Sequence, residues 1–183
     1  MHPFTKFVRS SIFIGFFFGI SQAGNYSADT TVNGMKIQLH VSPAEQFFTK
    51  DQVSAGKAKN GMVVIRGAKP LPPDAETKPN LHLVVHVSDS LTTRPISNAK
   101  VRMRFRSLDE KSMQTGTPVD VPIVEMQAIG KGEESTHYGN NVVMQNGPYL
   151  IDVEVNGSKI TFRTGRLFGP TSTAVEPKSS MGY

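Results

Sequence analysis

Short segments in which apolar and polar residues alternate constrain the fold of this 183-residue chain more than any other feature. Successive side chains of a strand point to opposite faces, so a period of two predicts a strand with one buried face. The most regular segment is 81–88, where one face carries Leu81, Leu83, Val85 and Val87 and the other carries His82, Val84, His86 and Ser88. Further segments that we interpret as strands are 35–41, 61–66, 101–105, 121–128, 141–144, 149–155 and 160–163.

Turn residues separate these segments and indicate the fold class. Asn146-Gly147 and Asn156-Gly157 are dipeptides typical of tight turns, and the second closes a hairpin. No segment has the pattern of a long helix. We therefore expect an all-β protein, an immunoglobulin-like antiparallel β-sandwich of seven to eight strands.

One segment fits either a helix or a loop. Ser42-Pro43-Ala44-Glu45 has the form of a capping box with proline at the first helical position. Residues 44–51 would then form one or two helical turns, and a plain loop is the equal alternative.

The first 23 residues differ from the rest of the chain, because they are rich in Phe and contain no acidic residue. A basic region with Lys6 and Arg9 precedes an apolar run over residues 12–20, and Ser21-Gln22-Ala23 has the form of a cleavage site. We predict a secretory signal peptide cleaved after Ala23, the alternative being an uncleaved N-terminal anchor. The apolar run is shorter than the ~20 residues of a membrane span, and no other stretch qualifies, so we expect no span after cleavage.

Charge and cysteine content exclude several functions. Cleavage would remove two positive charges and lower the net charge from +5 to about +3, which is too little to steer the chain toward nucleic acid. The chain has no Cys, which excludes disulfides, thiolate metal sites and a cysteine nucleophile. An exported chain without cysteine fits a bacterial envelope, and we expect a periplasmic protein.

The predicted mature chain has one domain and two tails. We expect a flexible arm over residues 24–34, a β-sandwich domain over residues 35–164, and a flexible tail over residues 165–183, where Pro, Ser, Thr and Gly dominate.

The residue patterns that catalysis needs are missing. The chain has no Gly-x-Ser-x-Gly elbow and no phosphate-binding glycine loop before a helix. Glu133 and Glu134 are adjacent in a predicted loop, which does not define an acid/base pair. We therefore do not expect an enzyme.

His and Met residues provide the chemistry of a metal site instead. Imidazole with thioether suits copper, and imidazole with carboxylate suits iron or zinc. His82 and His86 would stand ~13 Å apart on one face of a strand, too far to share an ion directly. Each would need a partner from a neighbouring strand, and His40, on the polar face of segment 35–41, is one candidate.

A row of basic residues lines the outer face of segment 101–105, namely Lys100, Arg102, Arg104 and Arg106. Such a row would suit phosphate binding or the docking of a partner. We favour a solvated face in which Asp152 and Glu154 are the cross-strand partners.

The string His137-Tyr138-Gly139-Asn140-Asn141, followed by Gly147-Pro148-Tyr149 and an alternating strand, resembles the periplasmic iron-transport protein family. Members carry a His-Tyr-Gly-x-Asn segment shortly after a strand that contains Met. The resemblance covers residues 80–155 and implies an immunoglobulin-like sandwich, a cleaved signal, a dimer, and a copper or iron site built from His, Met and acidic side chains. A looser similarity to small copper-handling envelope domains rests on the His-rich strand and the Asp turn after it.

The same resemblance implies individual ligands. Carried over by position, His137, Met126 and His82 would bind the metal. The family has an acidic residue two positions after the first of its histidines, where this chain has Val84. Reserve ligand candidates are His86, His40, Met144 and Glu125.

These observations predict an exported periplasmic protein that binds a copper or ferrous ion reversibly and supports its uptake or handover. A second copy of the chain and an envelope permease or other metal-handling protein are the expected partners. The alternative is a structural or interaction module of the cell envelope that holds no metal and docks a partner through a sheet edge or its basic face.

Overall fold

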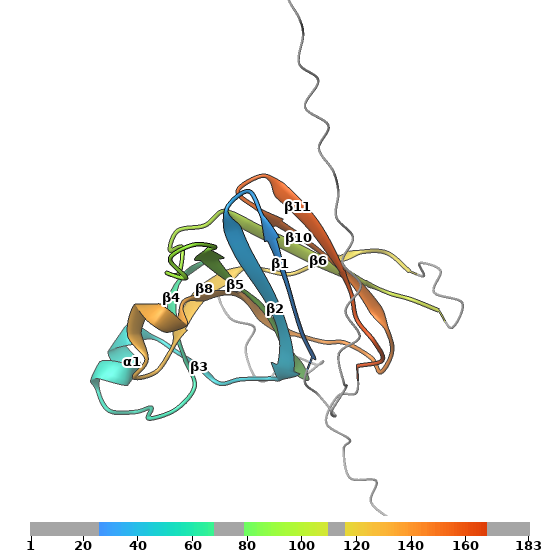
Figure 1. Cartoon of the computed structure of the whole chain (residues 1–183). Helices are drawn as coiled ribbons and strands as arrows, with labels where there is room; N and C mark the ends of the chain where they lie inside the picture. Colours follow the sequence, from blue (N-terminus) through green and yellow to red (C-terminus); the bar gives the residue numbers. More distant parts are fainter. Residues whose placement is uncertain (1–25, 68–78, 110–115, 168–183) are drawn as a thin grey trace, which may run out of the picture.

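The computed structural model of the chain describes residues 26–67, 79–109 and 116–167. Nearly all regular structure in these ranges is β, in two layers (Figure 1). The larger sheet contains β1 (Tyr26–Val32), β2 (Met35–Pro43), β3 (Phe47–Phe48), β4 (Met62–Gly67), β5 (Leu81–Asp89), β8 (Val124–Ala128) and β9 (His137–Val142). The smaller sheet contains β6 (Val101–Ser107), β7 (Val119–Asp120), β10 (Tyr149–Val155) and β11 (Ser158–Arg163).

The strand order places β5 near the centre of the larger sheet. That order is β1-β2-β5-β9-β8-β4-β3, and the smaller sheet has the order β11-β10-β6-β7. All pairs are antiparallel except β3 with β4. The short helix α1 (Lys50–Ser54) follows β3 at the edge of the sheet that lies far from β10 and β11 (Figure 1).

The main core lies between the two sheets. Alternate residues of β2, β5 and β10 point inward, which is the pattern that segments 35–41, 81–88 and 149–155 predicted. Each fully buried aliphatic side chain contributes about 1.5–3 kcal/mol to folding. The predicted all-β sandwich is confirmed.

Several boundaries differ from those expected. The described residues form eleven strands instead of seven or eight, because β3 and β7 have only two residues each and because β1 was not expected. Within the expected arm, β1 pairs with β2 along its whole length through a turn at Asn33-Gly34, where both residues have positive φ. Within the expected tail, Leu167 is buried in the main core and pairs with Gly147.

The helix starts later than the capping box at Ser42 predicted. Ser42 and Pro43 are the last residues of β2. The N-cap of α1 is Thr49, whose side chain accepts from the backbone of Gln52, while the Gln52 side chain accepts from the backbone of Thr49. A capping box therefore exists, but seven residues further along the chain.

A second, smaller apolar cluster lies on the outer face of the larger sheet. Its buried members are Val84, Val124 and Met126, and Phe47, Met62 and Val64 pack against it. This cluster covers the part of the outer face formed by β3, β4 and β8, next to β5.

The predicted signal peptide with its cleavage site, and residues 168–183 of the predicted tail, lie outside the described residues. No helix in the described part of the chain is both long and apolar enough to cross a membrane.

Candidate metal site

Four histidines share the outer face of the larger sheet. His82 and His86 are on β5, His40 is on β2, and His137 is on β9. His40 pairs with Val84, so it lies between the levels of His82 and His86. The β5–β9 register brings His137 beside β5 at the level of His86. We call these four residues the histidine cluster.

The four rings form a continuous series. The ring centroids of His82 and His137 are 5.8 Å apart, those of His137 and His86 are 4.9 Å apart, and those of His86 and His40 are 5.1 Å apart. His137 therefore contacts both histidines of β5. His40 contacts His86, so each β5 histidine has a partner from a neighbouring strand.

Hydrogen bonds fix the protonation of the two most buried rings. The Asn141 amide donates to the Glu45 carbonyl (2.7 Å) and its oxygen accepts from the Glu45 backbone (3.1 Å), which orients the amide. The same oxygen lies 2.9 Å from His82 Nδ1, and the Ser135 carbonyl lies 2.6 Å from His137 Nδ1. Because these oxygens can only accept, both Nδ1 atoms carry the hydrogen and both Nε2 atoms present a lone pair.

These two Nε2 atoms have no hydrogen-bond partner. His82 is 2 % exposed and His137 is 3 % exposed, and both Nε2 atoms are buried. A buried polar atom without a partner costs folding free energy and calls for an explanation. A metal ion bound to the two Nε2 lone pairs would explain why these atoms are buried without a partner.

Burial lowers the pKa of every histidine in the cluster. Desolvation, followed by the neighbouring His137, lowers the pKa of His82 to about 4, although the Asn141 hydrogen bond opposes the shift. Desolvation and then the other three rings lower the pKa of His86 to about 3. Desolvation is also the main cause that lowers the pKa of His40 and His137. At neutral pH the imidazoles are therefore neutral, which is the form that binds metals.

A thioether lies beside the cluster. Met126 is fully buried and pairs directly with His137 across β8 and β9. It belongs to the outer apolar cluster with Val84, and the ring of Phe47 stands 5.7 Å from that of His82. His137, Met126, His82, His86 and His40 thus all lie on one face of one sheet.

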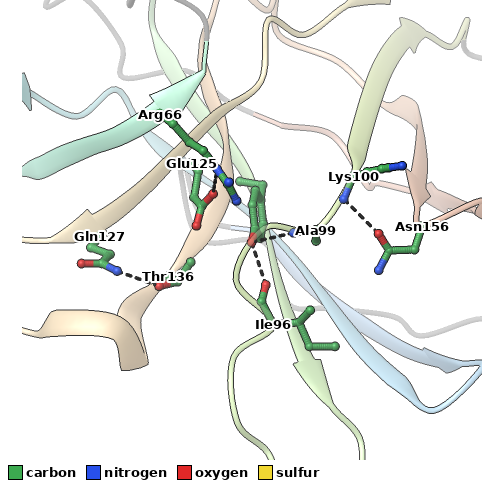
Figure 2. A network of polar contacts seen from close by, with 9 residues as sticks. Arg66, Ile96, Ala99, Lys100, Glu125, Gln127, Thr136 and Asn156 are labelled. Carbon is green, nitrogen blue, oxygen red and sulfur yellow. Dashed lines mark hydrogen bonds and ion pairs between the residues drawn. The ribbon is translucent and has the colours of Figure 1, made fainter.

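Two reserve candidates lie elsewhere. Glu125 is buried but pairs with Tyr138 on the opposite face of the sheet from Met126, and it forms an ion pair with Arg66 (Figure 2). Met144 belongs to the main core between the sheets. Neither side chain is on the face that carries the histidine cluster.

The basic row on β6 has carboxylate partners. Asp152 lies 3.3 Å from Arg104 and 2.6 Å from Arg106, and Glu154 pairs with Arg102. The predicted cross-strand partners are confirmed for Asp152. This arrangement favours the solvated face over a phosphate site.

Sequence reasoning assigned no role to Asn141, Phe47 or Ser135. Asn141 belongs to the string that carries the family resemblance, and its place four residues after His137 on one strand puts it on the same face. That spacing could have predicted its contact with His82. Nothing in the sequence pointed to Phe47 or to the Ser135 carbonyl, because both come from loops and strand ends whose course depends on the tertiary fold.

The described residues contain no group of three His, Asp or Glu side chains arranged to hold a metal ion. The ring contacts of the histidine cluster are pairwise, namely His82–His137, His137–His86 and His86–His40. Binding an ion with three or more ligands therefore requires side-chain rotation.

No protein-family model and no curated protein sequence matches this chain. Two solved structures of FetP from uropathogenic Escherichia coli are similar to it in fold. The first, FetP as isolated after expression in the periplasm, has a TM-score of 0.52 and 11 % identity over 79 % of this chain and 97 % of that chain. The second, a copper-bound FetP variant, has a TM-score of 0.52 and 13 % identity over 86 % of this chain and 100 % of that chain. The resemblance to periplasmic iron-transport proteins is thus confirmed at the level of the fold.

Proposed function

We propose that this chain is an exported, non-catalytic protein that binds a copper or ferrous ion at the histidine cluster and supports its uptake or handover. The observation that carries the proposal is the pair of buried Nε2 atoms of His82 and His137. Both are neutral, both lack a hydrogen-bond partner, and both rings are oriented through Nδ1. Metal-binding histidines are oriented by the same kind of second hydrogen bond.

The ring separations support this proposal. With a metal–nitrogen bond of about 2 Å, the centroids of two imidazoles on one tetrahedral ion stand about 5 Å apart, and on a linear ion about 6.5 Å. The three contacts of the histidine cluster measure 4.9, 5.1 and 5.8 Å. Small side-chain rotations would therefore place two of these rings on a common ion.

The surroundings suit a soft cation. The Met126 thioether beside His137 is a ligand type that favours Cu(I). The apolar side chains of Val84 and Phe47 would exclude water from the bound ion. We therefore propose copper as the preferred ion and Fe(II) as the alternative.

The proposed location, cargo and partners are supported by other observations than the geometry of the site. The predicted signal peptide and the periplasmic expression of FetP support a periplasmic location, and the copper-bound FetP variant supports copper as the cargo. A homodimer and an envelope permease or other metal-handling protein are the partners we propose. The absence of nucleophile and acid/base motifs supports a role without catalysis.

The proposal is tested by metal titration of purified residues 24–183. Cu(I), supplied under anaerobic conditions with a competing chelator, should bind the wild type tightly, and a parallel titration uses Fe(II). His137→Ala should weaken copper binding by on the order of 100-fold or more, because it removes the ring that contacts both His82 and His86. Thermal unfolding checks that the variant is folded, and His137→Gln repeats the test with a smaller change in volume.

Two methionine variants provide a matched control. Met126 and Met103 are both buried, but Met103 belongs to the main core. Met126→Leu should weaken copper binding by about tenfold, and Met103→Leu should leave it unchanged. A wild type that binds neither ion, or a His137→Ala variant that is folded and binds copper with wild-type affinity, would contradict the proposal.

A further inference from the structure

The histidine cluster has an outer half as well as a buried half. We propose that His40 and His86 form a separate outer binding station, through which the copper ion reaches and leaves the buried pair His82 and His137. This inference rests on the proposed function. It adds a second site and a direction of entry, which follow from burial, ring contacts and the closure of the opposite end.

Burial changes in one direction along the series of rings. His82 and His137 are almost fully buried, whereas His86 and His40 are partly exposed. Beyond His40, the residues of β1 on the same face are exposed, including Ser27, which pairs with His40. An ion arriving from water therefore meets His40 first and His82 last.

The other end of the series is closed. Phe47 contacts the His82 ring edge to face, and the buried side chains of Val84, Val124 and Met126 fill the face next to it. Asn141 ties His82 to the backbone of Glu45 in the segment before Phe47. An ion that came from this side would have to displace packed side chains.

The outer pair has the geometry of a two-imidazole site. Its ring centroids are 5.1 Å apart, about the separation of two imidazoles on one ion. His86 also lies 4.9 Å from His137, so it belongs to both halves. The ion can then move inward by ligand exchange, in which a metal–nitrogen bond to His137 replaces the bond to His40 and no electron is transferred.

One carboxylate lies near the outer pair. Asp29 lies on β1 and pairs with Gln38, and its charge partly opposes the burial that lowers the pKa of His40. The Asp29 carboxylate is 56 % exposed and has Lys36 3.8 Å away. Because Asp29 and Lys36 carry opposite charges, the direction of entry rests on burial and on the ring contacts.

The test compares the rate and the equilibrium of copper binding in the purified protein. Transfer of Cu(I) from a coloured chelator complex is followed by the loss of absorbance, and affinity is measured by chelator competition. His40→Gln should slow both loading and release by roughly tenfold and change the affinity by less than about threefold, because a station on the path alters both rates equally.

Gln38→Ala is the matched control. Gln38 is on the same face of β2, partly exposed, and pairs with His86, but it carries no imidazole. This variant should load at the wild-type rate.

The outcomes separate the two proposals. If the wild type binds no copper, the proposed function fails. If the wild type binds copper and His40→Gln loads at the wild-type rate, only the outer station is excluded. A His40→Gln variant with faster release and much weaker affinity would overturn the inference too, since His40 would then belong to the final site.

Discussion

The protonation of four imidazoles decides how the metal-free protein responds to pH. The pKa of His82 is about 4 and that of His86 about 3, both below the ordinary value of 6.5, because burial disfavours the charged ring. The folded state therefore binds fewer protons than the unfolded state once the pH falls below 6.5. The stability that the neutral rings provide is complete above that pH and is lost as the pH falls toward 3.

We expect the free energy of unfolding of the metal-free protein to fall by roughly 4 kcal/mol between pH 7 and pH 5 through His82 and His86. Urea unfolding at the two pH values measures this difference. His86→Gln removes one titrating ring and should reduce the pH-dependent loss. An unfolding free energy that is equal at pH 7 and pH 5 would show that the rings are not buried as described.

At the scale of elements, the approach of β9 to β5 holds the histidine cluster together. Gly139 pairs with Val84 on one side and Val124 on the other. A Cβ atom at Gly139 would lie 2.0 Å from the Leu83 carbonyl oxygen and 2.7 Å from Val84 Cα. Because both are backbone atoms, they cannot move aside without separating the strands.

Gly139→Ala should therefore destabilise the fold by more than about 2 kcal/mol and weaken the contact of His137 with β5. Gly165→Ala is the matched control, since a Cβ there meets nothing within 4 Å. It should change the unfolding free energy by less than about 0.5 kcal/mol. Urea unfolding of both variants measures the difference, and equal stabilities would refute the close approach.

Strands with strong alternation were predictable, and strands without it were not. Residues 81–88 carry branched aliphatic side chains at every second position, and β5 forms there as expected. The residues on the inward side of β1 are Tyr26, Ala28, Thr30 and Val32. They do not alternate strongly between apolar and polar, so the strand could not be predicted without its pairing to β2. The expected strand over 141–144 left out His137, because β9 includes glycine and two asparagines, whose preferences tertiary packing overrides.

At the scale of the whole molecule, the candidate metal site lies on the outer face of the larger sheet. The inner face of the larger sheet builds the main core, and its outer face carries the histidine cluster and the apolar cluster beside it. Strands β2, β5 and β9 each contribute histidines, so the site exists only in the folded sheet.

Part of the candidate site could be predicted from single residues. The types His and Met, together with the family resemblance, identified His137, Met126 and His82. The contacts could not be predicted, because they depend on the register between β5 and β9 and on the hydrogen bonds of Asn141 and Ser135. The spacing of His82 and His86 along one strand could not predict that His137 lies beside both of them.

The most direct test of metal binding at the histidine cluster is anomalous X-ray diffraction from crystals of the copper-loaded protein, with data collected on either side of the copper absorption edge. We predict an anomalous peak about 2 Å from the Nε2 atoms of His82 and His137, next to Met126. A copper-loaded crystal whose only anomalous peaks lie away from these residues would contradict the account.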